Sequence, residues 1–327
     1  MPFGVAAYSF PCGCGFAQRN GRPASARPIT AWDLIDMASE HALTSVEIPL
    51  QGTLPDVSNA TIDRLRALLE QRGLALIVDT GVVEVETLRA TLPLAVRAGA
   101  RVVRATISPI LEGARTGMPG GWDAHVDEIR RRIVALRPDL ERHGLTVALE
   151  NHQDTTSDEL LAFCEAGGEH VGVTFDVVNP LAVAEEPFAF ARKLGPRIHN
   201  VHIKEYQIFP TPSGYRLVRC AIGEGVIDWP AMLALLGEVA PGAHRQIELA
   251  ALYARHIRLL EDDWWGSFPP RDVRDVVPTL RLLAGNARGP GDPWQSPWER
   301  DAPAEEVEQW ERGQFEASVS YLRSIGA

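Results

Sequence analysis

Cysteine is scarce in this sequence, and long apolar runs are absent from it. Only Cys12, Cys14, Cys164 and Cys220 are scattered over 327 residues, which excludes the disulfide framework of a small secreted protein. Cys12 and Cys14 fit small residues near a turn. A redox or metal pair is the alternative, although no second pair completes a zinc site. No stretch approaches 18 uninterrupted apolar residues, so the sequence predicts no membrane span.

Basic charge is also in deficit. The net charge is −11 and the pI is near 5.3, which argues against a surface that binds nucleic acid. The first residues carry neither a basic segment nor a long apolar core, so we expect no signal peptide and a cytoplasmic location. The composition fits a soluble protein that handles small, neutral or metal-bound substrates, without a nucleic-acid or membrane partner.

Short apolar runs recur along the chain, with helix-like segments between them. Eight runs are predicted to be strands, over residues 4–10, 45–50, 74–80, 101–107, 145–151, 171–177, 198–204 and 245–250. Helices are predicted between them, for example over 32–42, 61–72, 86–98 and 126–143. Several of these helices end in a glycine just before the next strand.

Eight strands that alternate with helices indicate a parallel sheet. A chain of this length with eight such units favours closure into an α/β fold, the (β/α)8 TIM barrel. A doubly wound open sheet is the alternative, but no Gly-x-Gly-x-x-Gly follows the first strand.

The C-terminal part departs from this rhythm. Residues 286–303 are rich in proline and glycine and indicate an irregular connector. Residues 304–325 have helical periodicity, with Phe315, Val319 and Leu322 on one face. We therefore predict a catalytic barrel over 1–285 and a C-terminal helical extension over 286–327. The helix is expected to dock on the barrel, and a contact between subunits is the alternative.

Polar side chains end the last four predicted strands. They are Glu150, Asp176, His202 and Glu248, separated by 26, 26 and 46 residues. The first two separations match one strand–helix unit, and the third adds an insertion over 207–225 that we interpret as a long loop. Chemistry in this fold lies at the C-terminal ends of the strands, so we expect the four side chains to converge.

Three buried carboxylates without a partner would repel one another and lose hydration. A divalent cation removes that conflict, and oxygen-rich sites with one imidazole favour Mn²⁺, Mg²⁺ or Co²⁺ over structural zinc. Each residue alone is more often an ion-pairing or capping group. Four at matched strand ends predict one divalent metal ion, with Mn²⁺ as the leading candidate.

The segments "LENH", "FDVVN", "HIKEY", "GEGVIDW" and "IEL" resemble the sugar phosphate isomerase/epimerase superfamily, whose fold is the xylose-isomerase-like TIM barrel. That superfamily includes ketose 3-epimerases, inosose dehydratases and hydroxypyruvate isomerases. The resemblance covers about residues 3–285 and implies that Glu150, Asp176, His202 and Glu248 bind the metal. Resemblance to the 3-epimerase branch also implies that Glu150 and Glu248 exchange protons with opposite faces of the substrate.

The chemistry agrees with that resemblance. A metal chelated by a carbonyl and its neighbouring hydroxyl acidifies the C–H bond between them and holds the resulting enediolate. A nearby carboxylate can then remove the proton. Its return from the other face is epimerisation, and its return to the neighbouring carbon is isomerisation. A leaving group β to the carbanion would instead be eliminated.

Two further residues are candidates for catalysis, because residues two apart on a strand share a face. His152 follows Glu150 by two positions and is a candidate base or substrate hydrogen-bond partner; a hydrogen bond to a loop carbonyl is the alternative. Lys204 has the same relation to His202 and is one of only two lysines. It is expected to serve an enolate or substrate oxygen, and a surface ion pair with Glu205 is the alternative.

Asn179, Glu47 and Arg104 are candidate substrate-binding residues. Asn179 lies three residues after Asp176, where ketose 3-epimerases typically carry a substrate-binding histidine, so the chain departs from that branch. Glu47 and Arg104 lie on the second and fourth predicted strands. They could line the pocket, although we favour ion pairs inside the barrel for both.

The arginine that the 3-epimerases carry soon after the metal histidine is also missing. Arg216 or Arg219 in the insertion could replace it, but a solvated loop arginine is the more common case. Farther along, Trp264, Trp265 and Phe268 are expected to pack near the barrel mouth, and a lid over the substrate is the alternative.

The leading hypothesis is a metal-dependent isomerase or epimerase that acts on a keto-sugar or related polyol. The alternative is a lyase on the same scaffold, either a keto-inositol dehydratase or a 3-oxo-glycoside eliminase, with a possible partner subunit. An endonuclease of this superfamily would need more histidines and a basic groove, and four intact ligands count against a non-catalytic module. We expect a small sugar as the substrate and a homo-oligomer as the assembly.

Overall fold

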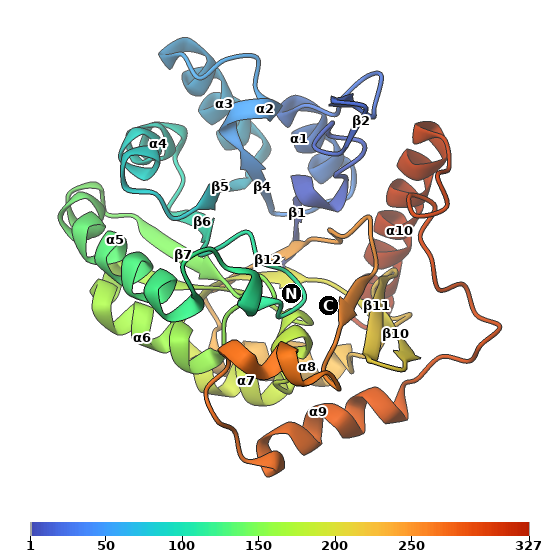
Figure 1. Ribbon diagram of the computed structural model, residues 1–327. Coiled ribbons are helices and arrows are strands. Elements are labelled where there is room, and N and C mark those ends of the chain that lie inside the picture. The colour runs from blue at the N-terminus through green and yellow to red at the C-terminus, as the bar shows by residue number, and fades with distance from the viewer. Residues whose placement is uncertain (1, 327) are drawn as a thin grey trace.

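The computed structural model describes residues 2–326 and contains a closed barrel of eight parallel strands (Figure 1). Around the barrel the strands follow the order β1, β12, β9, β8, β7, β6, β5, β4, and β4 pairs with β1. Their bounds are β1 Gly4–Ala6, β4 Ser45–Pro49, β5 Ala75–Val82, β6 Val102–Thr106, β7 Thr146–Glu150, β8 Val171–Asp176, β9 Ile198–Ile203 and β12 His244–Ile247. All eight predicted strands are present, which confirms the TIM barrel.

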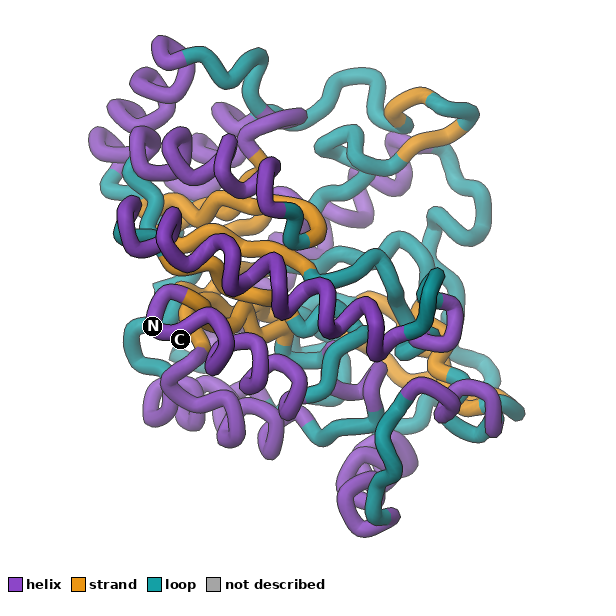
Figure 2. The backbone as a smooth tube through the Cα atoms, turned by 60° about the vertical axis from the view of Figure 1, so that its left-hand side comes forward, coloured by secondary structure: helices purple, strands orange, loops and turns teal. Residues whose placement is uncertain are grey.

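Helices surround the strands (Figure 2). The α-helices are α1 Ala31–Glu40, α2 Leu50–Thr53, α3 Asn59–Arg72, α4 Val85–Ala98, α5 Trp122–His143, α6 Ser157–Gly167, α7 Pro187–Leu194, α8 Trp229–Val239, α9 Val273–Gly285 and α10 Ala304–Ser324. Short 3-10 helices cover Ala7–Ser9, Arg115–Gly117, Gly168–His170, Asn179–Val183, Gly195–Arg197 and Asp262–Ser267, and β2 Gln18–Arg19 pairs with β3 Arg22–Pro23. No helix within residues 2–326 is long and apolar enough to cross a membrane.

The predicted glycine stops are confirmed. Gly73, Gly99 and Gly144 follow α3, α4 and α5 with φ angles of 66°, 88° and 62°, a conformation that L-residues with a side chain rarely adopt. The chain therefore leaves each helix abruptly and enters the next strand within three residues.

The barrel strands are buried on both faces, which explains why they read as nearly continuous apolar runs. In β7, for example, every residue after Thr146 is buried. The polar residues that end these strands are therefore desolvated, and each one needs a partner.

The insertion after β9 is a β-hairpin, so its interpretation as a long loop was wrong. β10 (Tyr206–Thr211) and β11 (Gly214–Arg219) pair in antiparallel fashion, and β13 (Arg255–Ile257) adds a third strand beside β11. Pro210 and Pro212 favoured the loop interpretation. They are tolerated because β10 is an edge strand and the second proline lies in the turn.

The extension helix α10 docks against the start of the barrel chain (Figure 1). Phe315, Val319 and Leu322 are buried, as their spacing predicted, and the Phe315 ring meets Phe10 with centroids 5.3 Å apart. The expected docking of this helix on the barrel is therefore the arrangement found.

One fully buried carboxylate fastens α10 to the loop after β1. The two carboxylate oxygens of Glu311 accept hydrogen bonds from the backbone N–H groups of Cys12 and Gly13, each at 2.9 Å. The loop that carries both cysteines is thus fixed by the C-terminal helix, and all four cysteines are free thiols.

The aromatic segment after β13 packs against the loop that follows β6. Trp264 is buried, its indole N–H donates to the carbonyl oxygen of Glu112 at 2.8 Å, and its ring stacks on Phe268 at 4.6 Å. The Arg115 guanidinium lies 4.4 Å from the Phe268 ring centroid. The aromatic side chains therefore pack within the protein, as predicted in preference to a lid over the substrate.

The Glu311 anchor makes a testable prediction. Glu311→Ala leaves two buried N–H groups without acceptors, so we expect the free energy of unfolding to fall by on the order of 3 kcal/mol. Urea denaturation followed by circular dichroism measures this loss. Glu316→Ala on the exposed face of α10 is the control and should change stability little. Equal stability of the two variants would contradict the anchoring role.

Candidate metal centre at the barrel mouth

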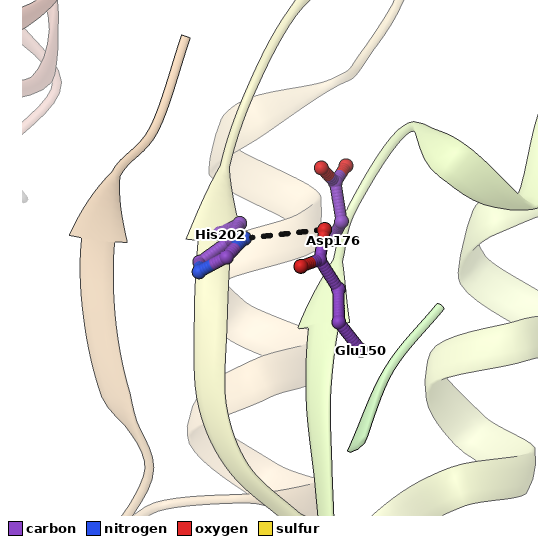
Figure 3. Close-up of side chains that lie close together, drawn as sticks. All are labelled: Glu150, Asp176 and His202. Atoms are coloured by element: carbon purple, nitrogen blue, oxygen red, sulfur yellow. Dashed lines mark ion pairs between the residues drawn. The ribbon is translucent and has the colours of Figure 1, made fainter. Parts of the chain in front are cut away.

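Three of the predicted ligands converge at the C-terminal ends of three adjacent strands (Figure 3). Glu150 ends β7, Asp176 ends β8 and His202 is near the end of β9. One ligand atom from each side chain lies within 4.8 Å of the other two, and each residue is at most 1% exposed. This trio can hold a metal ion.

Glu150 is fixed through one oxygen and presents the other to the cluster. Its Oε2 accepts hydrogen bonds from Nε of Arg104 at 2.6 Å and from Nη2 of the same guanidinium, while its Oε1 lies 3.6 Å from His202 Nδ1. Burial opposes ionisation, but the charges of Arg104 and His202 hold the Glu150 pKa well below its usual range. Arg104 also donates to Asp79 at 2.7 Å.

His202 is oriented by Glu47 on β4. The Nε2 atom of His202 lies 2.8 Å from Glu47 Oε1, and Asn200 donates to the other Glu47 oxygen at 2.7 Å. The Nδ1 atom is buried and has no hydrogen-bond partner within residues 2–326. A carboxylate that holds one ring nitrogen and leaves the other free is typical of metal-bound histidines. Glu47 and Arg104 therefore form ion pairs inside the barrel and also support the ligand candidates.

Asp176 is held by its own turn and by a neighbouring amide. Its Oδ1 accepts from the backbone N–H groups of Val178 and Asn179 at 3.2 and 3.3 Å. The side-chain amide of Asn151 holds the backbone of Asp176. It donates to the Asp176 carbonyl oxygen and accepts from the Asp176 backbone N–H. Burial raises the pKa of Asp176 to about 6, although the charge of Lys204 opposes this rise.

The fourth predicted ligand, Glu248, lies beside Lys204 rather than in the trio. The Lys204 ammonium lies 2.9 Å from Asp176 Oδ2 and 2.8 Å from Glu248 Oε2, so it bridges the two carboxylates. Burial lowers the Lys204 pKa, but the two carboxylates raise it well above its ordinary value. The alternative ion pair with Glu205 is wrong, because that carboxylate is buried and accepts from Trp229 Nε1 at 2.5 Å.

The charge balance around the trio fits a divalent cation. Five buried carboxylates lie near two buried basic side chains. The basic side chains are Arg104 and Lys204, and the carboxylates are Glu47, Asp79, Glu150, Asp176 and Glu248. Burial lowers the pKa of His202, but Glu47 and Glu150 raise it well above its ordinary value. A cation held by one atom each of Glu150, Asp176 and His202 would offset this excess negative charge with the oxygen and nitrogen ligands that such ions prefer.

Two further side chains border the cluster. His152 lies two residues beyond the end of β7, and its Nδ1 is buried without a partner in the part of the chain that the structure describes. Burial lowers its pKa to about 4 despite the nearby charge of Glu150, so the imidazole is neutral at pH 7. Tyr8, just after β1, was missed by the sequence reasoning, because a tyrosine in an apolar run looks like a strand residue. Burial and the charge of Asp79 raise its pKa to about 12.

Asn179 is buried at the same mouth. Its Oδ1 accepts from Gln153 Nε2 at 3.1 Å. The insertion arginines differ from each other: Arg216 pairs with Glu299 at 2.5 Å, whereas Arg219 is buried at 3% exposure. The expectation of a solvated loop arginine is therefore wrong for Arg219, because the hairpin and α10 enclose it.

The metal site predicts a loss of bound metal when a ligand is removed. Protein loaded with Mn²⁺ and then desalted should retain less than about a tenth of the wild-type metal in Glu150→Gln and in His202→Ala. Inductively coupled plasma mass spectrometry measures the content. His170→Ala, which changes a histidine whose Nδ1 lies 3.1 Å from the Leu145 carbonyl oxygen, is the control and should retain the metal. Wild-type content in both ligand variants would rule out the site.

The Glu47–His202 contact predicts a smaller effect on the same quantity. Glu47→Gln weakens the orientation and basicity of His202, so we expect the metal dissociation constant to rise about 10- to 100-fold. Titration with Mn²⁺ under isothermal calorimetry measures it. Glu70→Gln on the exposed face of α3 should leave the constant unchanged. An unchanged constant in Glu47→Gln would show that His202 needs no such support.

Comparison with known proteins places this site in a family. A family model described as the xylose isomerase-like TIM barrel matches residues 35–261. The uncharacterised protein YihM of Escherichia coli K12 is 27% identical over 267 residues, which is 78% of this chain and 79% of that protein. The 3-oxo-isoapionate decarboxylase of Pectobacterium atrosepticum is 21% identical over 235 residues, or 71% and 79% of the two chains. A solved L-ribulose 3-epimerase superimposes with a TM-score of 0.56 at 14% identity, covering 100% of this chain and 97% of that one. The family model matches more than half of this chain, so the chain belongs to the xylose isomerase-like TIM-barrel family.

Proposed function

We propose that this protein is a divalent-metal-dependent isomerase or epimerase that acts on a keto-sugar or related polyol. The observation that carries the proposal is the convergence of Glu150, Asp176 and His202, which bring one ligand atom each to within 4.8 Å of the others. A divalent cation held there would acidify the C–H bond next to a substrate carbonyl and stabilise the enediolate that proton loss produces. Such a centre would serve an enzyme that moves a proton next to a carbonyl.

The chain's own residues divide the remaining work. Arg104 keeps Glu150 ionised and fixes one of its oxygens, which suits Glu150 to holding the cation rather than carrying a proton. Glu248 directly follows β12 and His152 lies beyond β7, and β9 and β8 separate these two strands in the barrel. These two side chains therefore border the cluster from two sides, as removal and return of a proton on opposite faces of a substrate require.

Lys204 supplies the positive charge at the reaction centre. Its ammonium contacts both Asp176 and Glu248 and stays protonated, so it can donate a hydrogen bond to a substrate oxygen that becomes negative. Its position beside Glu248 also places a proton donor next to the candidate base.

A lyase is the second candidate, and two observations favour it. Arg104 engages Glu150 so closely that only one of the two glutamates expected to carry protons remains available. A relative with 21% identity is a 3-oxo-isoapionate decarboxylase. Loss of carbon dioxide or of a leaving group passes through the same kind of enediolate or enolate and needs fewer proton transfers. Dehydration of a keto-inositol and elimination from a 3-oxo-glycoside belong to this candidate.

Reactions in deuterated water separate the candidates. With Mn²⁺ and a panel of keto-sugars and keto acids, we expect the C–H next to the carbonyl to exchange for deuterium without fragmentation, as followed by NMR. Release of carbon dioxide, water or an aglycone would instead favour the lyase. If no substrate shows either exchange or fragmentation, both candidates are wrong.

The two lysines offer a matched pair of variants. Lys204→Met should slow the exchange by about 10²- to 10⁴-fold, because a proton donor next to the reacting oxygen is lost, while the metal content stays at the wild-type level. Lys193→Met removes the other lysine, which pairs with Asp158 on the helical exterior, and should leave the rate unchanged. A wild-type rate in Lys204→Met would contradict the role of its ammonium.

A further inference from the structure

The sheet of β10, β11 and β13 gathers polar side chains on one of its faces. Tyr206 pairs with Arg219, and Leu217 pairs with Arg255. Residues paired across antiparallel strands share a face, and so do residues two apart along a strand. Tyr206, Arg219 and Arg255 therefore lie on the same face, with the two arginines as diagonal neighbours.

This face is directed at the barrel mouth. Tyr215, which shares it, donates its hydroxyl to the carbonyl oxygen of Leu181 in the segment after β8. Tyr206 receives a hydrogen bond at 3.4 Å from Gln153 in the segment after β7. The opposite face carries Arg216, which pairs with Glu299 of the C-terminal connector. The face that carries Tyr206 and Tyr215 thus contacts the loops that carry the proposed site.

Hydrogen-bond donors without acceptors collect on the mouth side. Arg219 Nη1, Arg255 Nε and Asn179 Nδ2 are all buried without a partner within residues 2–326. The rest of the Arg219 guanidinium is fixed, because Nε donates to Gln314 at 2.7 Å and Nη2 donates to the carbonyl oxygen of Ser9 at 2.9 Å. Buried donors are normally paired, so these atoms indicate an acceptor that the protein itself does not supply.

Two carboxylates near these donors already contact a basic side chain. Lys204 pairs with Asp176 and Glu248, the two carboxylates closest to it. Burial raises the pKa of Tyr206, and the positive charges of Lys204 and Arg255 partly offset this rise. Arg255 therefore lies close enough to Tyr206 for its charge to influence the tyrosine hydroxyl. An anionic group of a ligand would supply the acceptors that these donors lack.

We propose that Arg219, Arg255 and Asn179 bind an anionic oxygen group of the substrate, which makes acidic sugars the substrate class of this enzyme. Ionised oxygens only accept hydrogen bonds, whereas the hydroxyl of a neutral polyol also has a proton to place. Planar guanidinium and amide N–H groups match a carboxylate especially well, and a phosphate ester offers the same chemistry. The proposal rests on the proposed function for the location of the reacting carbons, but binding of the anion does not require turnover.

A binding experiment tests the proposal without catalysis. Glucitol, gluconate and glucitol 6-phosphate share a six-carbon polyol chain and lack a reactive carbonyl, so calorimetry with the Mn²⁺-loaded protein reports affinity alone. We expect gluconate to bind at least about tenfold more tightly than glucitol, the gain typical of one charge-assisted hydrogen bond. Arg255→Gln should abolish this preference. Arg258→Gln is the control, because Arg258 is exposed and pairs with Asp263, and it should keep the preference.

Each outcome decides the proposal. The proposal is overturned if gluconate does not bind or if gluconate and glucitol bind equally well. It is also overturned if the preference for gluconate survives in Arg255→Gln, because chelation of the metal by the carboxylate alone would give that result. Tighter binding of the phosphate ester, lost in Arg255→Gln, would identify a phosphate as the source of the anion. Arg255→Lys keeps the charge and should retain part of the preference if Arg255→Gln does not fold. The anion preference is measured with ligands that cannot react, and proton exchange is measured with carbonyl substrates, so failure of this proposal and failure of the proposed function are distinguishable in the wild-type protein.

Discussion

The structure depends on the concentration of buried negative charge at the barrel mouth, where five carboxylates lie on or just after β4, β5, β7, β8 and β12. Carboxylates at these positions cannot be left unpaired, because each would lose its hydration and repel the others. Arg104 and Lys204 offset part of this charge, and both are buried by the same strands. Burial lowers the pKa of His202, but the remaining negative charge of Glu47 and Glu150 raises it above its ordinary value. The fit of this cluster to a metal ion therefore rests on the charge distribution of the barrel and not only on the ligand set.

The supporting contacts give similar residues different properties. Glu150 and Glu248 both end barrel strands, but Arg104 binds only Glu150. The two carboxylates thus differ in their basic neighbour, because Glu248 contacts the Lys204 ammonium. This asymmetry agrees with the proposed division between holding a cation and moving a proton. It also explains why a pattern of ligands shared by a family does not by itself determine the reaction.

Much of this arrangement could be predicted from the sequence, because the period of parallel strands is local information. The end of each strand follows from its apolar run, and the four polar residues follow from those ends. The contact between Glu47 and His202 could not be predicted, since it joins residues 155 apart through the closure and register of the barrel. The hairpin was missed for a related reason. Pro210 reads as a strand breaker, and only the knowledge that β10 lies at an edge makes it acceptable.

The extension reaches the mouth through an arginine of the hairpin. Gln314 of α10 accepts from Arg219 Nε, and the ring of Trp310 lies 4.7 Å from the same guanidinium. The free Nη1 of Arg219 therefore takes its direction from a helix outside the segment matched by the family model. In a fold that supports many reactions by varying what surrounds its strand ends, the substrate class can be set by such an added segment. In the proposed arrangement, the metal ligands belong to the barrel, and the anion is bound by residues after three different strands, of which Arg219 in the insertion is oriented by the extension.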